Sequence, residues 1–242
     1  MRTIRIYQPG DYSVGDVVEL SPTASQHVGV VLRMQPDDKV ILFCGDNREL
    51  TACITQVQKK KVIVIIVAEQ FVSRESPRAI HLAQAISKGD RMEWVVQKAV
   101  ELGVASITPI FTTHCVVKLD SERLSKKQAQ WQAIAIAACE QSGRNYVPVV
   151  HSACSLSEYL HACDATFKLV LHPYAAKSWR EGVGATGDIA LLIGPEGGLS
   201  DEEVIHAQTH GFDSLCLGPR ILRTETAAVA ALSVLQALAG DL

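Results

Sequence analysis

The sequence has little of what marks membrane-embedded or exported proteins. No apolar run approaches the roughly 18 residues that a membrane-spanning helix requires, and the longest candidate, Val62–Ala68, has the length of a strand. The charged residues near the amino terminus are not followed by the apolar segment of a signal peptide, so we expect no export.

The sequence also gives no sign of paired cysteines. The seven cysteines are odd in number and scattered, and no two of them form a Cys-x-x-Cys pair. Such cysteines are typical of a reducing compartment, where most of them act as small buried apolar side chains. We therefore expect a cytoplasmic protein.

A uniformly basic surface is missing as well. Lysine and arginine number 23 against 26 aspartate and glutamate residues, which gives a net charge of −3. A polyanionic partner would therefore have to be bound by local basic clusters. What the sequence does have is 48% hydrophobic residues over 242 positions, which is enough to form a core and excludes a disordered chain.

Residues 1–72 carry the pattern of a small β domain. Four segments rich in β-branched residues predict strands, and apolar residues at helical spacing predict one helix at Thr23–Met34. The predicted strands are Val17–Leu20, Lys39–Phe43, Leu50–Thr55 and Val62–Ala68. Their spacing is typical of a barrel, and the polar segment Val72–Pro77 predicts a domain boundary.

Residues 73–242 change to strands that alternate with longer helices. This pattern predicts an α/β domain in which helices cover both faces of a parallel sheet. The predicted strands are Ile80–Ile86, Ser106–Thr112, Phe167–His172, Ile189–Ile193 and Ser214–Leu217. A long helix is expected at Ser121–Gln141 and a terminal helix at Ala227–Leu238.

Three further helix starts are marked by the capping-box spacing, in which Asp or Ser is followed three residues later by Glu. The pairs are Asp90 with Glu93, Ser155 with Glu158, and Ser200 with Glu203. In such a box each side chain bonds the backbone amide of the other residue, so we expect a helix to begin after each of the three.

Three predicted strands run into loops that carry unusual residues, at 171–173, 193–200 and 217–226. Because the carboxyl ends of parallel strands meet at one edge of a sheet, we expect these loops to converge on one crevice. Glycines in the second and third loops would let the backbone approach a ligand there. The simpler alternative is that each Gly-Pro pair only shapes a tight turn.

The loops lack the Gly-x-Gly-x-x-Gly fingerprint of dinucleotide-binding proteins and the Gly-x-x-x-x-Gly-Lys-Ser/Thr phosphate loop. They offer backbone amides and carbonyls beside apolar side chains such as Leu171, Ile193 and Leu222. Such surroundings suit a neutral adenine or ribose better than a triphosphate.

Two of the loops, GPEGG at 194–198 and LGPRILRTETA at 217–227, resemble the signature of the 16S ribosomal RNA uracil-N3 methyltransferases of the SPOUT superfamily. The resemblance continues over nearly the whole chain. Further blocks similar to that family lie at residues 27–33, 88–94, 97–98, 101–103 and 140–144.

The resemblance implies a fold and partners. A PUA-like RNA-binding β-barrel would occupy residues 1–72, and a SPOUT methyltransferase domain would occupy residues 73–242. In that family the C-terminal segment threads a deep trefoil knot that binds S-adenosylmethionine. A homodimer that acts on 16S rRNA or the 30S ribosomal subunit is also implied.

The three loops then supply the candidate cofactor-binding residues. These are Leu171, His172, Pro173, Ile193, Gly194, Pro195, Glu196, Gly197, Gly198, Leu217, Gly218, Ile221, Leu222, Arg223, Thr224 and Ala227. For His172, which follows an apolar strand, an ordinary polar surface position is the alternative.

Methylation of uracil N3 requires loss of the imide proton, and permanent cations would stabilise the resulting negative charge. Arg220 and Arg223 are the candidate catalytic cations, with solvation or a salt bridge as the alternative. Glu225 is the candidate catalytic carboxylate, with Glu196 also near the loops, although an acid in the first turn of a helix is favoured by the helix dipole alone. Thr224 is expected to cap that helix, and the general base stays open.

Metal and RNA contacts complete the predictions. His206 and His210 have metal-ligand spacing on a helix, but no third ligand is apparent, and we expect no metal. The candidate RNA contacts are the basic residues Arg2, Arg5, Arg33, Lys88 and Arg91. Each alone is typical of a solvated surface, whereas together they predict salt-sensitive association with RNA.

The sequence thus predicts an S-adenosylmethionine-dependent methyltransferase for N3 of one 16S rRNA uridine. One alternative is a non-catalytic RNA-binding or ribosome-assembly factor that keeps a vestigial cofactor pocket. Another is a dinucleotide-dependent oxidoreductase, which suits an α/β sheet but lacks the required fingerprint. Measured affinity for the methyl donor separates the enzyme from the assembly factor.

Overall fold

The computed structural model describes residues 4–58, 61–116, 120–175 and 186–242. The chain forms two units. The first comprises Met1–Glu75 together with Cys139–Val147, and the second comprises Ser76–Ala138 together with Pro148–Leu242. The first unit therefore takes in a segment from far beyond the continuous range 1–72.

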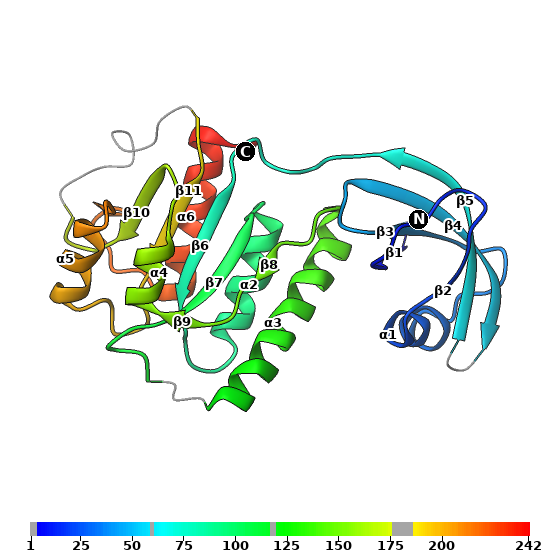
Figure 1. Cartoon of the computed structure of the whole chain (residues 1–242), viewed down its shortest axis with the longest axis horizontal. Helices are drawn as coiled ribbons and strands as arrows, with labels where there is room; N and C mark the ends of the chain where they lie inside the picture. Colours follow the sequence, from blue (N-terminus) through cyan, green and yellow to red (C-terminus); the bar gives the residue numbers. More distant parts are fainter. Residues whose placement is uncertain (1–3, 59–60, 117–119, 176–185) are drawn as a thin grey trace. The chain divides into compact units, whose positions relative to one another are not determined.

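The first unit is built on one five-stranded sheet. The strands are β1 (Ile4–Tyr7), β2 (Val17–Glu19), β3 (Lys39–Phe43), β4 (Arg48–Gln58) and β5 (Lys61–Phe71), in the order β1-β3-β4-β5-β2 (Figure 1). β1 pairs with β3 in parallel, and the other neighbours are antiparallel. Alternate residues such as Val40, Leu42, Val62 and Val64 point into a common apolar core, as the two-residue period of a strand requires.

The helix expected at Thr23–Met34 is wrong in its length and form. A short helix α1 (Pro22–Gln26) begins at Ser21, whose side chain accepts a hydrogen bond from the amide of Ala24. It continues as the π-helical turn η1 (His27–Val31), in which the amide of Leu32 bonds the carbonyl of His27.

A buried carboxylate joins distant segments of the first unit. Glu49 on β4, with a side chain that is 3% exposed, accepts hydrogen bonds from Arg5 and Arg74 (both 2.6 Å), Gln70 (2.9 Å) and Asn145 (3.1 Å). Asn145 belongs to the segment Cys139–Val147, and its amide also donates to the carbonyl of Val72. These bonds hold that segment in the first unit.

The second unit contains a seven-stranded sheet in which every pair is parallel. Six strands follow the order β12-β10-β11-β6-β7-β8, and β9 also pairs with β7. The strands are β6 (Ile80–Ala85), β7 (Ser106–Phe111), β8 (Val149–Val150), β9 (Cys154–Ser155), β10 (Phe167–Leu171), β11 (Ile189–Ile193) and β12 (Asp213–Leu215). Strand β11 thus inserts between β10 and β6, which precede it in the chain.

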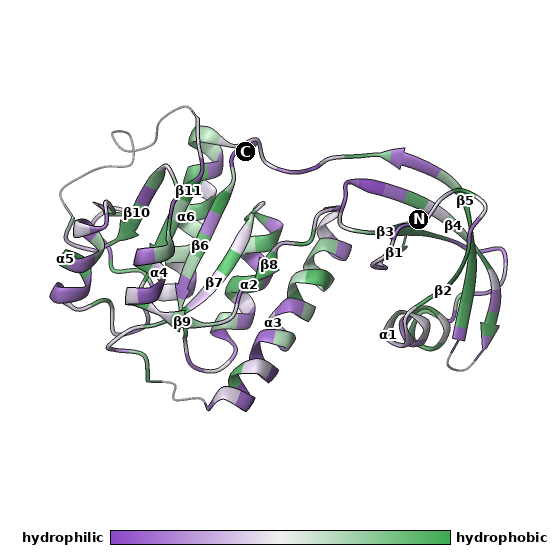
Figure 2. Ribbon diagram, in the orientation of Figure 1, coloured by the Kyte–Doolittle hydropathy of each residue, from purple (hydrophilic) through white to green (hydrophobic). Residues whose placement is uncertain are grey.

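Helices cover both faces of this sheet. On one face α4 (Leu156–Ala162) and α5 (Asp201–Thr209) share a core with β6 and β11. The other face is covered by α2 (Arg91–Glu101) and α6 (Thr224–Ala239), and α3 (Ser121–Ser142) precedes β8 (Figure 1). In Figure 2 the central strands are largely hydrophobic, whereas α3 and α5 also carry hydrophilic residues. The α/β architecture predicted for this part of the chain is confirmed.

Two of the three expected capping boxes are confirmed. Ser155 and Ser200 each accept a bond from the amide three residues later, and Glu158 and Glu203 reach back to the cap amides. The box expected at Asp90 is wrong, because its side chain makes no capping hydrogen bond. Among the residues that the structure describes, no helix is long and apolar enough for a membrane span.

The Glu49 network predicts an acid-sensitive first unit. Burial alone would raise the pKa of Glu49, but the bonds from Arg74, Arg5, Asn145 and Gln70 outweigh burial and lower the pKa from 4.5 to about 2. The folded form is therefore favoured above pH 4.5, and this stability is lost as the pH falls from 4.5 to about 2. Full protonation removes on the order of 3 kcal/mol.

Hydrogen exchange of β4 and β5 amides between pH 2 and 5 measures this loss. In Glu49→Gln the extra acid sensitivity should disappear, since no carboxylate remains to titrate. Glu19→Gln removes an exposed ion pair with Lys61 and should keep the profile of the original protein. Parallel profiles for the Glu49 variant and the original protein would contradict the network's role.

Candidate functional site

The loops that follow β10, β11 and β12 meet at the carboxyl edge of the parallel sheet. They surround a cavity of about 700 Å³. The three strands are neighbours in the sheet, so their ends lie side by side although they are up to about 45 residues apart in the chain. The expected convergence of the three loops is thus present in the structure.

Every residue predicted to bind a cofactor or to act catalytically lines this one cavity. From the first two loops these are Leu171, His172, Pro173, Ile193, Gly194, Pro195, Glu196, Gly197 and Gly198, and from the third Leu217, Gly218, Arg220, Ile221, Leu222, Arg223, Thr224, Glu225 and Ala227. Tyr174, Leu199, Asp201, Leu215, Cys216 and Arg91 also line it. Most of these additions are chain neighbours of the predicted residues, and Arg91 comes from the start of α2. The role of each residue stays a prediction.

The hydroxyl of Thr224 links the second and third loops. It donates to the carbonyl of Gly194 at 2.7 Å and accepts from Nε2 of Gln84 at 2.9 Å. Gln84 on β6 is fully buried and Thr224 is 5% exposed, so both bonds lie in the interior. The expectation that Thr224 caps α6 is wrong, because Arg223 occupies the cap position. The threonine hydroxyl instead bonds Gly194 and Gln84.

Gln84, which donates a hydrogen bond to Thr224, was not predicted to support the site. A visible signal exists, because it is the amide side chain within the apolar run Ile80–Ile86. Its Oε1 atom is buried and has no hydrogen-bond partner among the described residues. Buried polar atoms are normally paired, and Gln84 does not line the cavity, so an ordered water is the natural partner of this oxygen.

Two glycines permit the loop geometry for different reasons. A Cβ on Gly197 would lie 2.9 Å from Cβ of His114, so the missing side chain makes room for His114. The sequence had suggested that this glycine makes room for a ligand. Gly218 has a φ of +96°, and a Cβ there would meet nothing within 4 Å. Gly218 therefore provides the left-handed turn of the third loop and leaves open space beside it.

An ion-pair chain crosses one wall of the cavity. Arg91 on α2 pairs with Glu196, and its Nε atom lies 3.8 Å from the carboxylate of Glu225. Burial raises the pKa of Glu196, but backbone amides, including that of Lys88, and the Arg91 guanidinium lower it below its usual range overall. Glu196 thus stays ionised, which disfavours it as a proton acceptor near neutral pH.

Glu225 has a different environment from Glu196. Its Oε1 atom faces Arg91, whereas its Oε2 atom is buried and has no hydrogen-bond partner among the described residues. An unpaired carboxylate oxygen at the wall of a cavity can accept a hydrogen bond from a hydroxyl or an ammonium group of a ligand.

Two arginines lie at the rim of the cavity. Arg220 and Arg223 are exposed, and neither makes an ion pair within the part of the chain that the structure describes. The alternative that a salt bridge occupies them therefore has no support here. Both guanidinium groups are available to a substrate.

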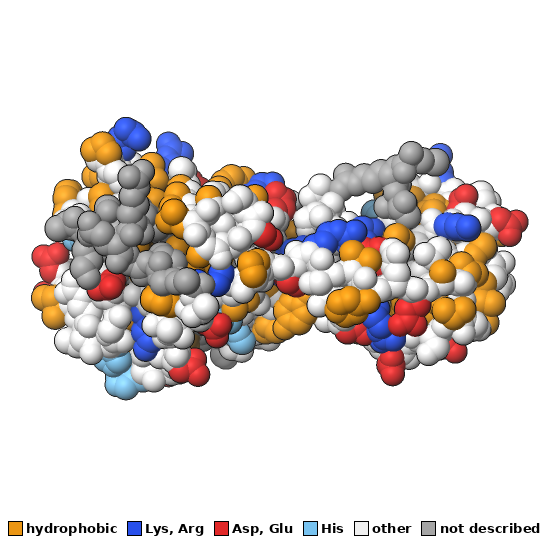
Figure 3. Space-filling model, turned by 90° about the horizontal axis from the view of Figure 1, so that it is seen from above, with side chains coloured by type: hydrophobic (Ala, Val, Ile, Leu, Met, Phe, Trp, Pro, Cys, Tyr) orange, Lys and Arg blue, Asp and Glu red, His pale blue; other side chains and the backbone are white. Residues whose placement is uncertain are grey.

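The predicted RNA contacts fall into different environments. Arg33 and Lys88 are exposed, and Arg91 belongs to the cavity wall. Arg2 lies outside the described residues. The expectation for Arg5 is wrong, because its side chain is 10% exposed and is paired with Glu49. On the face seen in Figure 3, basic and acidic side chains are interspersed, in agreement with the balanced composition.

The expectation that His206 and His210 have no third partner is also wrong. His161, at the end of α4, brings a third imidazole to the pair. The sequence offers no sign of this contact, because 45 residues separate His161 from His206 and only packing of α4 and α5 joins them.

Two family models match this chain, one in each of its two parts. Residues 74–236 match the family model described as RNA methyltransferase domain, and residues 20–67 match the model described as RNA methyltransferase PUA domain. Proteins named ribosomal RNA small subunit methyltransferase E are similar over most of the chain. That of Buchnera aphidicola subsp. Schizaphis graminum is 37% identical, with 100% of this chain and 98% of the relative covered, and that of Bacillus subtilis is 34% identical, with 90% and 91% covered.

Solved structures are similar over the full length. Lpg2936 of Legionella pneumophila, solved with the bound cofactor SAM, has a TM-score of 0.98 and 56% identity. Ribosomal RNA small subunit methyltransferase E of Neisseria gonorrhoeae, bound to S-adenosyl methionine, has a TM-score of 0.94 and 39% identity. In both cases the whole of each chain is covered.

We expect removal of the Thr224 hydroxyl to lower the free energy of unfolding, and a matched control variant can isolate this effect. Thr224→Val keeps the shape but leaves the Gly194 carbonyl and the Gln84 amide without this partner, at a cost of about 1–3 kcal/mol. Thr226→Val, at an exposed position in the same helical turn, should change stability by less than about 0.5 kcal/mol. Urea unfolding followed by the fluorescence of Trp94 and Trp131, both in the second unit, measures the difference. Equal effects of the two substitutions would contradict the proposed link.

Proposed function

The chain belongs to the RNA methyltransferase family, and we propose that it uses S-adenosylmethionine to methylate N3 of one uridine in the 16S rRNA of the small ribosomal subunit. The observation that carries the proposal is the convergence of three strand-end loops on one cavity of about 700 Å³. Full-length similarity to the Neisseria gonorrhoeae protein, solved with the same cofactor, supports this assignment.

The residues around the cavity fit the cofactor. Leu171, Ile193 and Leu222 provide apolar walls for an adenine, and the backbone of the second and third loops provides amides and carbonyls beside them. The unpaired Oε2 atom of Glu225 can accept a bond from a hydroxyl or the ammonium group. When bound, S-adenosylmethionine supplies an activated methyl group on a sulfonium centre.

The task left to the protein is to position the base and to stabilise its anion. Loss of the N3 proton places negative charge on the two carbonyl oxygens of uracil. Arg220 and Arg223 are exposed at the rim and unpaired among the described residues, so they can face those oxygens without first breaking an ion pair. Arg91 is already engaged by Glu196 and Glu225, which suits it to shaping the wall.

The finer architecture is part of the proposal. We assign residues 1–72 to a PUA-like RNA-binding barrel and residues 73–242 to a SPOUT methyltransferase domain whose C-terminal segment forms a trefoil knot. The path of the chain supports a knot: after the edge strand β12 it returns to the centre of the sheet, where Thr224 bonds Gly194 and Gln84.

A homodimer in the cytoplasm is likewise proposed. Ile221 at the cavity rim is 75% exposed and Trp94 on α2 is 42% exposed, so two large apolar side chains are left uncovered. A second copy that covers such side chains would also bring its own residues near the cavity.

Methyl transfer can be tested directly. Purified protein is incubated with methyl-labelled S-adenosylmethionine and 30S subunits that lack the modification, and the label is located by mass spectrometry of RNA fragments. We expect one labelled uridine, methylated at N3. A label on protein or on another RNA atom would overturn the substrate assignment, and subunit binding without transfer would identify an assembly factor.

Arg220 offers a test of anion stabilisation. Arg220→Gln should lower kcat by between about 10- and 1000-fold and leave the affinity for S-adenosylmethionine unchanged, because the cation acts on the base. Arg123→Gln, on the exposed surface of α3, serves as the matched control and should leave kcat unchanged. Single-turnover rates and calorimetric titration separate the two quantities. An unchanged kcat in Arg220→Gln, or equal losses of rate and cofactor affinity, would refute this role.

A further inference from the structure

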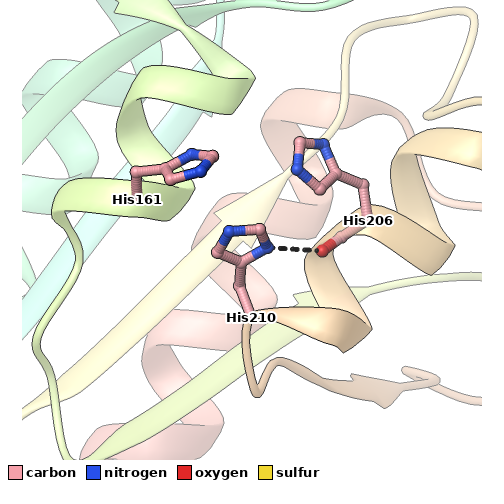
Figure 4. A group of neighbouring side chains, drawn as sticks. All are labelled: His161, His206 and His210. Atoms are coloured by element: carbon pink, nitrogen blue, oxygen red, sulfur yellow. Dashed lines mark hydrogen bonds between the residues drawn. The ribbon is translucent and has the colours of Figure 1, made fainter.

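Three histidines gather at the surface of the second unit, away from the loops that form the cavity. His161 lies in the last turn of α4, His206 in the last turn of α5, and His210 directly after α5 (Figure 4). The spacing of four residues places His206 and His210 on one side of their helix. Helices α4 and α5 pack on the same sheet face through Leu156, Leu160 and Ala207, which brings His161 opposite the pair.

The ring nitrogens are close enough to share one ion. One ligand nitrogen from each histidine lies within 4.8 Å of the other two. A zinc ion bound at about 2.0–2.1 Å in tetrahedral geometry requires nitrogens about 3.4 Å apart. The difference is within reach of small side-chain rotations, because His161 is exposed and the other two are half-buried.

Hydrogen bonds select the metal-binding tautomer in two of the rings. Nδ1 of His161 lies 2.8 Å from the carbonyl of Ser157, and Nδ1 of His210 lies 3.0 Å from the carbonyl of His206. A carbonyl oxygen only accepts, so each Nδ1 carries the proton and each Nε2 keeps a free lone pair. A hydrogen bond from one ring nitrogen to a backbone carbonyl orients metal-ligating histidines in known sites in the same way.

The electrostatic surroundings also favour a cation. Both helices end at the cluster, and the carboxyl end of a helix carries partial negative charge. The ammonium group of Lys168 donates to the carbonyls of Cys163 (2.6 Å) and His210 (3.4 Å), so it is directed at the backbone and leaves the imidazole nitrogens free.

We propose that His161, His206 and His210 form a site for a divalent transition metal, with zinc as the best match to three imidazoles and one open position for water. A bound ion would join α4 to α5, the helix that follows the second cavity loop. The site is independent of methyl transfer, and its ligands do not line the cavity.

Zinc titration of the full-length protein tests the site. After treatment with a chelator and a thiol reductant, the protein is titrated with Zn²⁺ in competition with a chromophoric chelator. We expect one equivalent with a dissociation constant in the micromolar range or below, weakened at least about tenfold by His161→Ala or His206→Ala. His151→Ala, an exposed histidine outside the cluster, should bind as the original protein does.

Cobalt identifies the ligands. Co²⁺ held by imidazoles gives visible d–d absorption without the near-ultraviolet charge-transfer band of a thiolate complex, which excludes the seven cysteines as ligands. Affinity for S-adenosylmethionine should stay unchanged in the histidine variants, which shows that they fold. Equal zinc affinity in the cluster variants and the control, a thiolate band, or no binding at 100 μM would each overturn the proposal.

Discussion

The pair of hydrogen bonds at the hydroxyl of Thr224 is the interaction on which the rest of the site depends. One bond reaches the carbonyl of Gly194 in the second loop, and the other comes from Gln84 on the central strand β6. The C-terminal helix α6 is thereby held against two strands that are adjacent in the sheet and distant in the chain. Without this contact, the second and third loops would lose a direct hydrogen-bonded link, and the buried apolar face of α6 would be left to hold the third loop in place.

Charge is divided between the interior and the rim of this cavity. The carboxylates of Glu196 and Glu225 face Arg91, which offsets one of their two negative charges within the wall. The remaining cations, Arg220 and Arg223, are exposed, which is where a nucleic-acid base carrying developing negative charge would have to enter. With a net charge of −3 the chain has no generally basic surface, so under the proposed function these two arginines would supply positive charge locally.

Local signals predicted well what local physics controls. Patterns of neighbouring residues predicted the capping boxes at Ser155 and Ser200 and the strand Ile189–Ile193. All three are present in the structure. Asp90 shows the limit of such signals, since an acid at the right spacing makes no capping bond there. The four-residue strand β1 escaped prediction because it is too short to show a period and gains its partner, β3, from a distant segment.

Contacts between distant segments could not be predicted from patterns. Arg5 is an N-terminal arginine in the sequence and a partly buried partner of Glu49 in the fold. Threonine is a residue type that often caps helices, yet the hydroxyl of Thr224 donates its hydrogen bond to the carbonyl of Gly194. His161 joins His206 and His210 only because α4 and α5 share one face of the sheet. In each case the chemistry of the residue was visible and its partner was not.

A crystal structure of this protein with S-adenosylmethionine tests the central claim most directly. The adenosyl group should lie between the backbone of residues 194–198 and that of residues 217–223, with the Thr224–Gly194 bond intact beneath it. Electron density for the cofactor at another place, or a complex in which the second and third loops have separated, would contradict the account.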